Sequence, residues 1–156
     1  MEHHVLRLWY RPAPGATPIE VQSLDLVAGQ GVDLDHTRGS MRHVTIVFED
    51  DWRRAAEEAG DADLDPVGRR ANVLLSGGGG QGWIKQWVRL GPSLFEVKGV
   101  TAPCGVMDEF HQGLKDALEP EARAGVWGRL HASGTLRVGD VWNATEERPA
   151  PQSRPS

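Results

Sequence analysis

Short apolar segments, separated by glycine and proline, recur along most of the chain. Apolar and polar side chains alternate in Val5–Tyr10 and Ile19–Leu26, which is the period of a strand with one buried face. His43–Phe48 is rich in β-branched and aromatic side chains, which favour strands. Further strands are predicted at Val73–Leu75, Trp87–Leu90, Leu94–Val97 and, as a pair joined by a Gly-Asp turn, within Gly134–Trp142. The pattern predicts a mainly β fold.

Helical patterns are fewer and shorter. The acidic pair at positions 50 and 51 can cap a helix that runs to Ala59, with Gly60 just after its C-cap. Asp65-Pro66 predicts a helical turn that leads to Arg70, because proline suits the first helical position. Apolar residues at helical spacing predict a third helix over Met107–Leu118, weakened by Gly113. Together these features predict a β-barrel-like domain with a few short peripheral helices.

The length of 156 residues suits one domain, and no internal boundary or repeat divides it. Hydrophobic residues make up 39% and charged residues 25%, which is an ordinary globular balance. Residues 146–156 differ, since they are rich in Pro, Ser and charge and have no apolar anchor. The chain is therefore expected to consist of a domain over residues 1–145 and a disordered tail over 146–156.

The balance of charge argues against some partners. There are 17 basic and 22 acidic side chains, a net charge of −5, and no dense basic face of the kind that binds nucleic acid. No apolar run approaches the roughly 20 residues needed to cross a bilayer. A single cysteine forms no internal disulfide, so a cytoplasmic location is expected. The oligomeric state stays open, because an exposed edge strand can pair between subunits.

Cys104 is the only cysteine and the leading candidate for chemistry. A lone cysteine is most often a buried, small hydrophobic residue. Here Pro103 is expected to end the preceding strand, and a following helix would place Cys104 near its N-terminus. The helix dipole and free N–H groups there favour the thiolate, which is the form that ligates metals or carries sulfur.

Two other polar segments are candidates for ligand binding. Residues 31–36 bring together glycine, aspartate and histidine, with Arg38, Arg42 and His43 following, and can orient an anion or form a solvated turn. Residues 69–73 present two arginines and Asn72, which can hold a phosphate or carboxylate or form an exposed helix end. The run Gly77–Gly82 lacks the Lys-Ser/Thr of a phosphate loop and is expected to be a flexible loop. The six histidines show no zinc-site spacing.

Taken in order, these segments resemble the MOSC family, named for the C-terminal domain of molybdenum-cofactor sulfurase. The resemblance runs from about Val21 to Val141. It rests on Gly31-Val32 and Asp35-His36, Arg42 before Val44-Thr45-Ile46, Arg70-Ala71-Asn72-Val73, Pro103-Cys104 with Met107, and Gly139-Asp140. It implies the β-barrel of that family, which is similar to a pyruvate-kinase-like barrel.

The resemblance also implies a function. Cys104 would face a cleft and either ligate the metal of a molybdenum–molybdopterin cofactor or carry sulfur. Asp35, His36, Arg42, Arg70 and Asn72 match positions that gather around this cleft in the family, and are expected to bind the cofactor. Stand-alone members are associated with the reduction of N-hydroxylated bases, with electrons from a separate donor protein.

Two residues depart from the family pattern. Leu34 stands where the turn commonly has a second glycine, and His43 where a glutamine is common. Because a non-glycine residue adopts positive φ only at a cost, Leu34 is expected to reshape the turn. Two alternatives to the cofactor-binding hypothesis remain: a metal-free sulfur carrier with a Cys104 persulfide, and a non-catalytic ligand- or partner-binding barrel in which Cys104 is buried.

Overall fold

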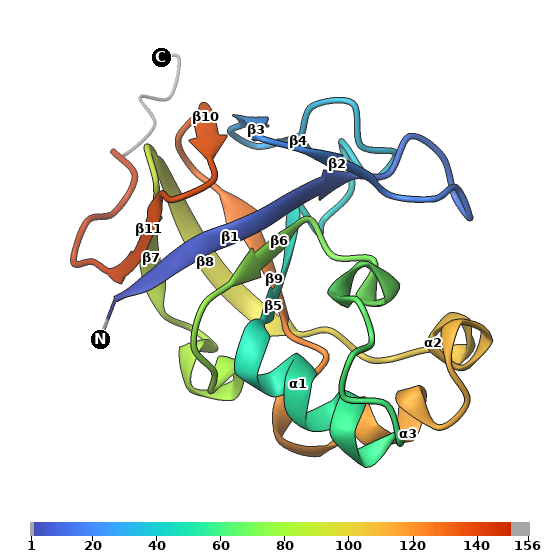
Figure 1. The fold of residues 1–156 in the computed structure, drawn as a ribbon. Coiled ribbons are helices and arrows are strands. Elements are labelled where there is room, and N and C mark those ends of the chain that lie inside the picture. The colour runs from blue at the N-terminus through green and yellow to red at the C-terminus, as the bar shows by residue number, and fades with distance from the viewer. Residues whose placement is uncertain (1, 151–156) are drawn as a thin grey trace.

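Figure 1 shows the protein as a computed structural model that describes residues 2–150, so residues 151–156 of the predicted tail lie outside the described part. The strands are β1 (His3–Tyr10), β2 (Ile19–Val21), β3 (Ser23–Val27), β4 (Gly31–Val32), β5 (Val44–Phe48), β6 (Val73–Leu75), β7 (Trp87–Leu90), β8 (Ser93–Val100), β9 (Val126–Leu130), β10 (Gly134–Arg137) and β11 (Val141–Ala144). The α-helices are α1 (Glu49–Glu58), α2 (Gly105–Phe110) and α3 (Leu114–Leu118), and the 3₁₀ turns are η1 (Pro66–Arg69), η2 (Gly80–Trp83) and η3 (Pro120–Ala122).

Seven of these strands close into a barrel. In the order β1, β6, β5, β9, β8, β7, β11, each strand pairs with the next, and β11 pairs back with β1 at His3 and Trp142. Within this barrel β5 and β6 are parallel and the other neighbours are antiparallel. β2 extends the sheet beside β1, while β10, β3 and β4 form a separate three-stranded sheet. The predicted mainly β, barrel-like fold is confirmed.

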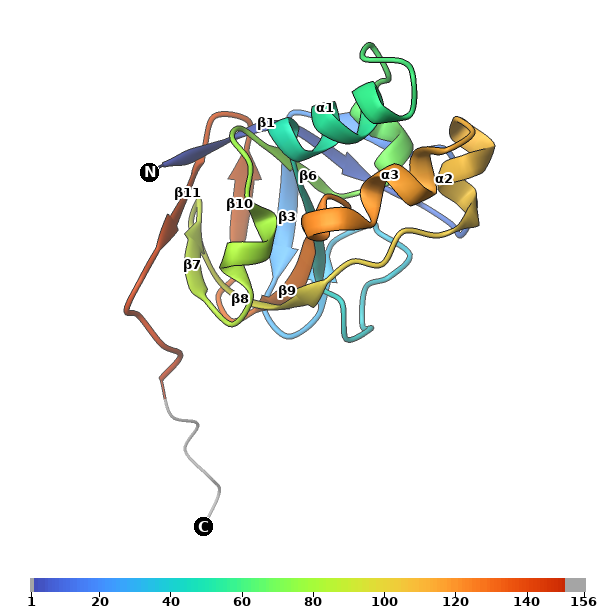
Figure 2. The same ribbon diagram turned by 90° about the horizontal axis from the view of Figure 1, so that it is seen from below.

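β5 shows how the core is organised, because it is buried along its whole length. Val44, Ile46 and Phe48 belong to the apolar cluster that fills the barrel. Val47 instead packs in a second cluster, which includes Trp52 of α1 and residues of α2 and α3. Because both faces of the strand are covered, four of its five residues are apolar, and the hydroxyl of the fifth, Thr45, is hydrogen-bonded to Asn72. Figures 1 and 2 both show the three helices gathered on one side of the barrel.

The end of α1 and the start of η1 are formed as the sequence predicts. Gly60 follows α1 at φ 97°, the left-handed conformation expected after a helix C-cap. Asp65 caps η1 by accepting a 2.8 Å hydrogen bond from the Val67 N–H. The predicted continuous helix over 107–118 is wrong, since α2 and α3 are separate and Gly113 between them has φ 90°. The glycine adopts a conformation that an α-helix does not contain.

The glycine run 77–82 is tied to α1. The Asp51 carboxylate accepts hydrogen bonds of 3.1 Å from the Gly79 and Gly80 N–H groups, so it does not cap its own helix, which begins at Glu49. These two amides are donors that a bound phosphate would need. Their use by Asp51 agrees with a structural loop rather than a phosphate loop.

β9 was not predicted from the sequence, although it lies between β5 and β8. Gly128 in its middle weakens an isolated strand signal. The barrel requires that glycine, because a Cβ atom there would lie 2.1 Å from the Glu96 carbonyl oxygen of the neighbouring strand. The close approach of two strands thus explains a residue that argues against a strand when it is considered alone.

The first residues after position 145 contact the barrel. The Glu147 carboxylate lies 2.5 Å from the Arg89 guanidinium of β7. The Arg148 guanidinium lies 4.9 Å from the centre of a Trp87 ring. Up to Arg148, therefore, the segment lies against β7.

Candidate functional site

Cys104 borders a cavity of about 310 Å³ that is lined by several basic side chains. Arg11, Arg42, Arg69 and Arg70 line it together with Thr101 and Cys104. No aspartate or glutamate is among its lining residues, so the cavity attracts anions. Its volume lies at the lower end of the range of small-molecule sites, about 300–1,000 Å³.

Cys104 itself is exposed to solvent. It is the N-cap residue of α2, with an extended backbone, and its carbonyl oxygen accepts a 3.0 Å hydrogen bond from the Met107 N–H. Pro103 precedes this helix start, as the sequence predicts. The alternative in which Cys104 is a buried core residue is therefore wrong. The thiol is accessible to a ligand in the cavity.

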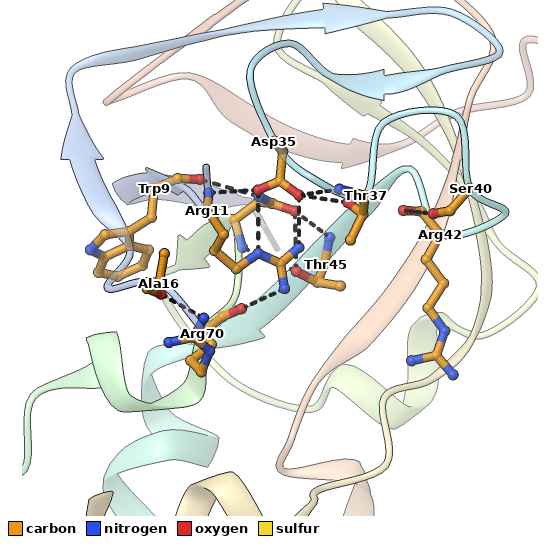
Figure 3. A network of polar contacts seen from close by, with 10 residues as sticks. Trp9, Arg11, Ala16, Asp35, Thr37, Ser40, Arg42, Thr45 and Arg70 are labelled. Carbon is orange, nitrogen blue, oxygen red and sulfur yellow. Dashed lines mark hydrogen bonds and ion pairs between the residues drawn. The ribbon is translucent and has the colours of Figure 1, made fainter. Parts of the chain in front are cut away.

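Behind the cavity lies a buried carboxylate, that of Asp35, whose side chain has no exposed surface. Arg11 donates to it from the backbone N–H at 2.7 Å and from the guanidinium at 3.1 and 3.3 Å. The Thr37 hydroxyl donates at 2.6 Å. Figure 3 shows the carboxylate held between these two residues. Asp35 thus orients Arg11, which lines the cavity, and is not itself among the lining residues.

Asn72 is fully buried and connects three segments. Its side-chain amide donates to the Asp35 carboxylate at 3.1 Å and to the Trp9 carbonyl oxygen at 3.2 Å. Its carbonyl oxygen accepts from the Thr45 N–H at 3.1 Å. These bonds hold the end of β1, the Asp35 turn and β5 together, so Asn72 positions loops around the cavity rather than lining it.

The other three predicted binding residues lie differently. Arg70 adopts the left-handed conformation at φ 59°, lines the cavity, and donates to the Ala16 carbonyl oxygen at 2.6 Å. Arg42 is exposed, lines the cavity and lies 5.4 Å from the centre of a Trp127 ring; in Figure 3 it stands apart from the Asp35 network. His36 is exposed and does not line the cavity, although its backbone N–H donates to the Arg11 carbonyl oxygen at 2.8 Å.

A comparison with models of protein families shows which family the sequence matches. A sequence model of the MOSC domain matches residues 33–143, which is most of the chain. The chain belongs to the MOSC domain family. A comparison with functionally curated proteins gives no match.

Solved structures share the fold of this MOSC domain. The YUAD protein from Bacillus subtilis is 18% identical with a TM-score of 0.78, and the match covers 92% of this chain and 96% of that one. YiiM from Escherichia coli is 17% identical with a TM-score of 0.71, covering 95% and 71%. YiiM from Geobacillus stearothermophilus is 14% identical with a TM-score of 0.73, covering 92% and 75%. At these identities the likeness concerns the fold.

Residues 2–150 show neither a cluster of metal-ligating side chains nor a helix that could cross a membrane. No group of three or more His, Cys, Asp or Glu side chains in residues 2–150 is arranged to hold a metal ion. A metal bound at Cys104 would therefore need most of its ligands from another molecule, as a pterin cofactor provides. In the same part of the chain, no helix has the length and apolar character required to cross a membrane.

Sequence reasoning missed Arg11 and Arg69 as cavity residues of the MOSC domain. Arg11 directly follows β1, and a basic residue at the end of a buried strand is a weak signal that was available. Arg69 belongs to the segment 69–73 that was considered for phosphate or carboxylate binding, but only Arg70 and Asn72 of that segment were predicted as binding residues. The burial of Arg69 within η1 depends on packing against the segment around Ala124, which the local sequence does not reveal.

The two departures from the family pattern are accommodated. Leu34 itself adopts the left-handed conformation, at φ 72°, and the residue is 67% exposed, so it takes the costly backbone conformation that a glycine adopts readily. His43 is buried, and its Nδ1 accepts a 2.9 Å hydrogen bond from the Leu130 N–H. Burial, followed by the charges of Arg129 and His131, lowers the pKa of His43. It supports the barrel and does not line the cavity.

Leu34→Gly is expected to stabilise the protein by about 0.5–1 kcal/mol. The left-handed conformation costs an L-residue roughly 1–2 kcal/mol, and the larger backbone entropy of glycine in the unfolded chain offsets part of the gain. The free energy of unfolding in urea measures the change. Leu34→Ala is the control, because it keeps the Cβ atom and should show no such gain. Equal stability of both variants would contradict the strain at this position.

The pH dependence of stability should report on Asp35. Burial acts to raise its pKa, but the hydrogen bonds from Arg11 and Thr37 and the Arg11 charge prevail and lower the pKa from 3.8 to about 2. A lowered carboxyl pKa stabilises the fold at pH values above 3.8, and this contribution is lost as the pH falls towards 2. At 1.36 kcal/mol per unit it amounts to about 2 kcal/mol. The difference in unfolding free energy between wild type and Asp35→Asn should therefore shrink by about 2 kcal/mol as the pH falls from 4 to 2, and a constant difference would contradict this.

Proposed function

We propose that this MOSC domain binds the molybdenum–molybdopterin cofactor in the cavity beside Cys104, with the Cys104 thiolate as a metal ligand. The observation that carries the proposal is the exposed thiol on the same cavity as four arginines. A cofactor with a thiolate-binding metal and a phosphate needs both of these features. The residues present fit the group.

Each residue would have a separate task. Cys104 would ligate the metal from the start of α2. Arg42 and Arg70 would bind the phosphate, since guanidinium groups match phosphate oxygens in geometry and charge. Asp35 and Asn72 would hold Arg11 in place through the hydrogen bonds described above. Arg11 in turn donates to the Arg70 carbonyl oxygen at 3.0 Å and so supports the Arg70 segment. His36 is proposed only as part of the turn that supports Arg11.

When bound, the cofactor supplies the redox chemistry, and the protein supplies binding, orientation and electrostatics. The reaction proposed for the loaded protein is the reduction of an N-hydroxylated base to the amine. Two electrons from a separate donor protein and two protons break the N–O bond, and the products are the amine and water. The basic cavity wall would exclude cations and admit a neutral or anionic substrate group next to the metal.

A metal-free sulfur carrier is the second candidate function. In this case Cys104 would hold a persulfide and pass its outer sulfur to an acceptor thiol or cofactor precursor. The exposure of Cys104 favours this candidate equally, because sulfur transfer needs an accessible thiol.

Elemental analysis distinguishes the two candidates. The protein is purified from a host that makes the pterin cofactor and from one that cannot, and molybdenum is measured per chain. We expect molybdenum close to one per chain from the first host only, with an unmodified Cys104. Equal traces of molybdenum from both hosts would contradict cofactor binding. An intact mass with one added sulfur on Cys104, without molybdenum, would favour the carrier.

A further inference from the structure

Arg69 is a buried cation without an acidic partner. Only 4% of its surface is exposed, and its Nε donates to the Ala124 carbonyl oxygen, a neutral acceptor. Its Nη2 is enclosed and has no hydrogen-bond partner among residues 2–150, and no ion pair with an acidic side chain is found there. A buried charge is destabilising unless an anion and hydrogen bonds compensate it. The fold therefore leaves room for an anion that is not part of the described chain.

Arg123, the other buried arginine of residues 2–150, and the half-buried Arg11 do have such partners. Arg123 is 5% exposed and lies 2.5 Å from the Glu58 carboxylate, with a further bond to the Ala117 carbonyl oxygen. Arg11 pairs with Asp35. Burial lowers the pKa of Arg69 to about 10, and the charges of Arg11 and Arg42 act in the same direction, whereas the Cys104 thiolate acts to raise it. Of the two buried arginines among the described residues, Arg69 is thus the one without a carboxylate partner, and it lines the Cys104 cavity.

A second donor without a partner lines the same cavity. Thr101 is 8% exposed, lines the Cys104 cavity, and its hydroxyl has no hydrogen-bond partner among the described residues. One turn holds both residues: the Ala124 carbonyl oxygen accepts from the Arg69 side chain, and the Gly125 carbonyl oxygen accepts from the backbone N–H of Thr101 at 2.9 Å. Gly125 has φ 99°, and a Cβ atom there would lie 1.9 Å from the Ile46 carbonyl oxygen. The turn is therefore packed against β5, and it holds the Arg69 guanidinium and the Thr101 backbone in place.

We propose that Arg69 and the Thr101 hydroxyl bind a tetrahedral oxyanion, a phosphate monoester or free phosphate or sulfate, at the wall of the Cys104 cavity. Arg42 and Arg70 on the same cavity add positive charge, which favours a dianion. The proposal rests on the proposed role of this cavity as the ligand site and does not require molybdenum. The oxyanion lies beside Cys104 and limits access to its thiol.

Alkylation of Cys104 in the metal-free protein tests the proposal. Iodoacetamide is neutral, so electrostatic screening does not change its approach, and chloride at equal ionic strength is the reference. We expect the alkylation rate to fall about tenfold when phosphate or sulfate reaches ten times its Kd, because only the free fraction reacts. The same rate in sulfate, phosphate and chloride would overturn the proposal.

Matched variants assign the effect to Arg69. Arg69→Met should fold with an unchanged or higher thermal midpoint in chloride, because an unpaired buried charge is removed, and should lose the anion protection of Cys104. Arg123→Met is the control: it leaves Glu58 unpaired, lowers the thermal midpoint and keeps the protection. Thr101→Val preserves shape and should weaken protection severalfold, which keeps the test valid if Arg69→Met does not fold. Wild-type protection in both Arg69→Met and Thr101→Val would overturn the assignment.

A second arm identifies the source of the oxyanion. If protein loaded with the pterin cofactor no longer responds to free sulfate, the phosphate monoester of the cofactor occupies the site. If the response persists, the site takes a free oxyanion. Either result supports the oxyanion site. Absence of molybdenum with anion protection intact would overturn the proposed function alone.

Discussion

Cys104→Ser is expected to lose molybdenum by more than about tenfold and to lose N–O reduction with it, since even second-shell changes at metal sites cost roughly 10–100-fold in affinity. Serine keeps the size of the side chain but replaces the soft thiolate by a hydroxyl that is protonated at neutral pH. Because the thiol is exposed and makes no core contact that the fold needs, the thermal midpoint should stay near that of the wild type. Molybdenum per chain, measured beside thermal unfolding, checks both statements.

Met107→Leu is the matched control for this variant. Met107 carries the other sulfur atom on the cavity and is buried against the helices, so leucine can replace its packing. It should retain molybdenum. Full molybdenum content and activity in Cys104→Ser would contradict the ligand role of Cys104. A loss in both variants would instead indicate damage to the cavity.

Asp35→Asn is expected to destabilise the protein by about 3–5 kcal/mol, the cost of removing one partner of a buried ion pair. The carboxylate accepts six hydrogen bonds, from Arg11, Thr37 and Asn72. An asparagine amide has one acceptor oxygen, and its N–H groups would face these donors. At about 2–4 °C per kcal/mol for a chain of this size, the thermal midpoint should fall by roughly 6–20 °C.

Asp33→Asn provides the comparison within the same turn. The Asp33 carboxylate also pairs with an arginine, Arg38, but both side chains are more than one-third exposed. Solvent-exposed pairs contribute about 0–1 kcal/mol, so this variant should be nearly as stable as the wild type. Comparable losses in the two variants would show that burial of the Asp35 network is not what stabilises it.

The sequence predicted much of the barrel because strand signals are local. Strands such as Val73–Leu75 and Trp87–Leu90 were predicted with the bounds that the structure has, since their apolar pattern lies within a few residues. β9 and the break before α3 were missed. In both places a glycine decides the local structure. Gly128 is needed because it lies close to Glu96 of the neighbouring strand, and Gly113 separates the two helices with its left-handed conformation. Local propensity reveals neither of these.

The candidate site, like the fold, was predicted from the sequence only in part. Order and spacing of motifs pointed to Cys104, Arg42 and Arg70, and all three line the cavity. Asp35 and Asn72 belong to the network behind it, and His36 is exposed outside it. A motif marks which residues occur together in a family, but it does not distinguish a side chain that faces a ligand from one that holds the backbone in place.

The sequence by itself determined the strand-rich class of the protein, the helix start behind Pro103 and the candidate thiol at Cys104. Each depends on residues that are close along the chain. Only the tertiary structure decided that Arg11 forms an ion pair with Asp35, while Arg69 is buried without an acidic partner. Closure of the barrel brings these distant segments together, and burial then determines which charges are neutralised within the chain and which require a ligand.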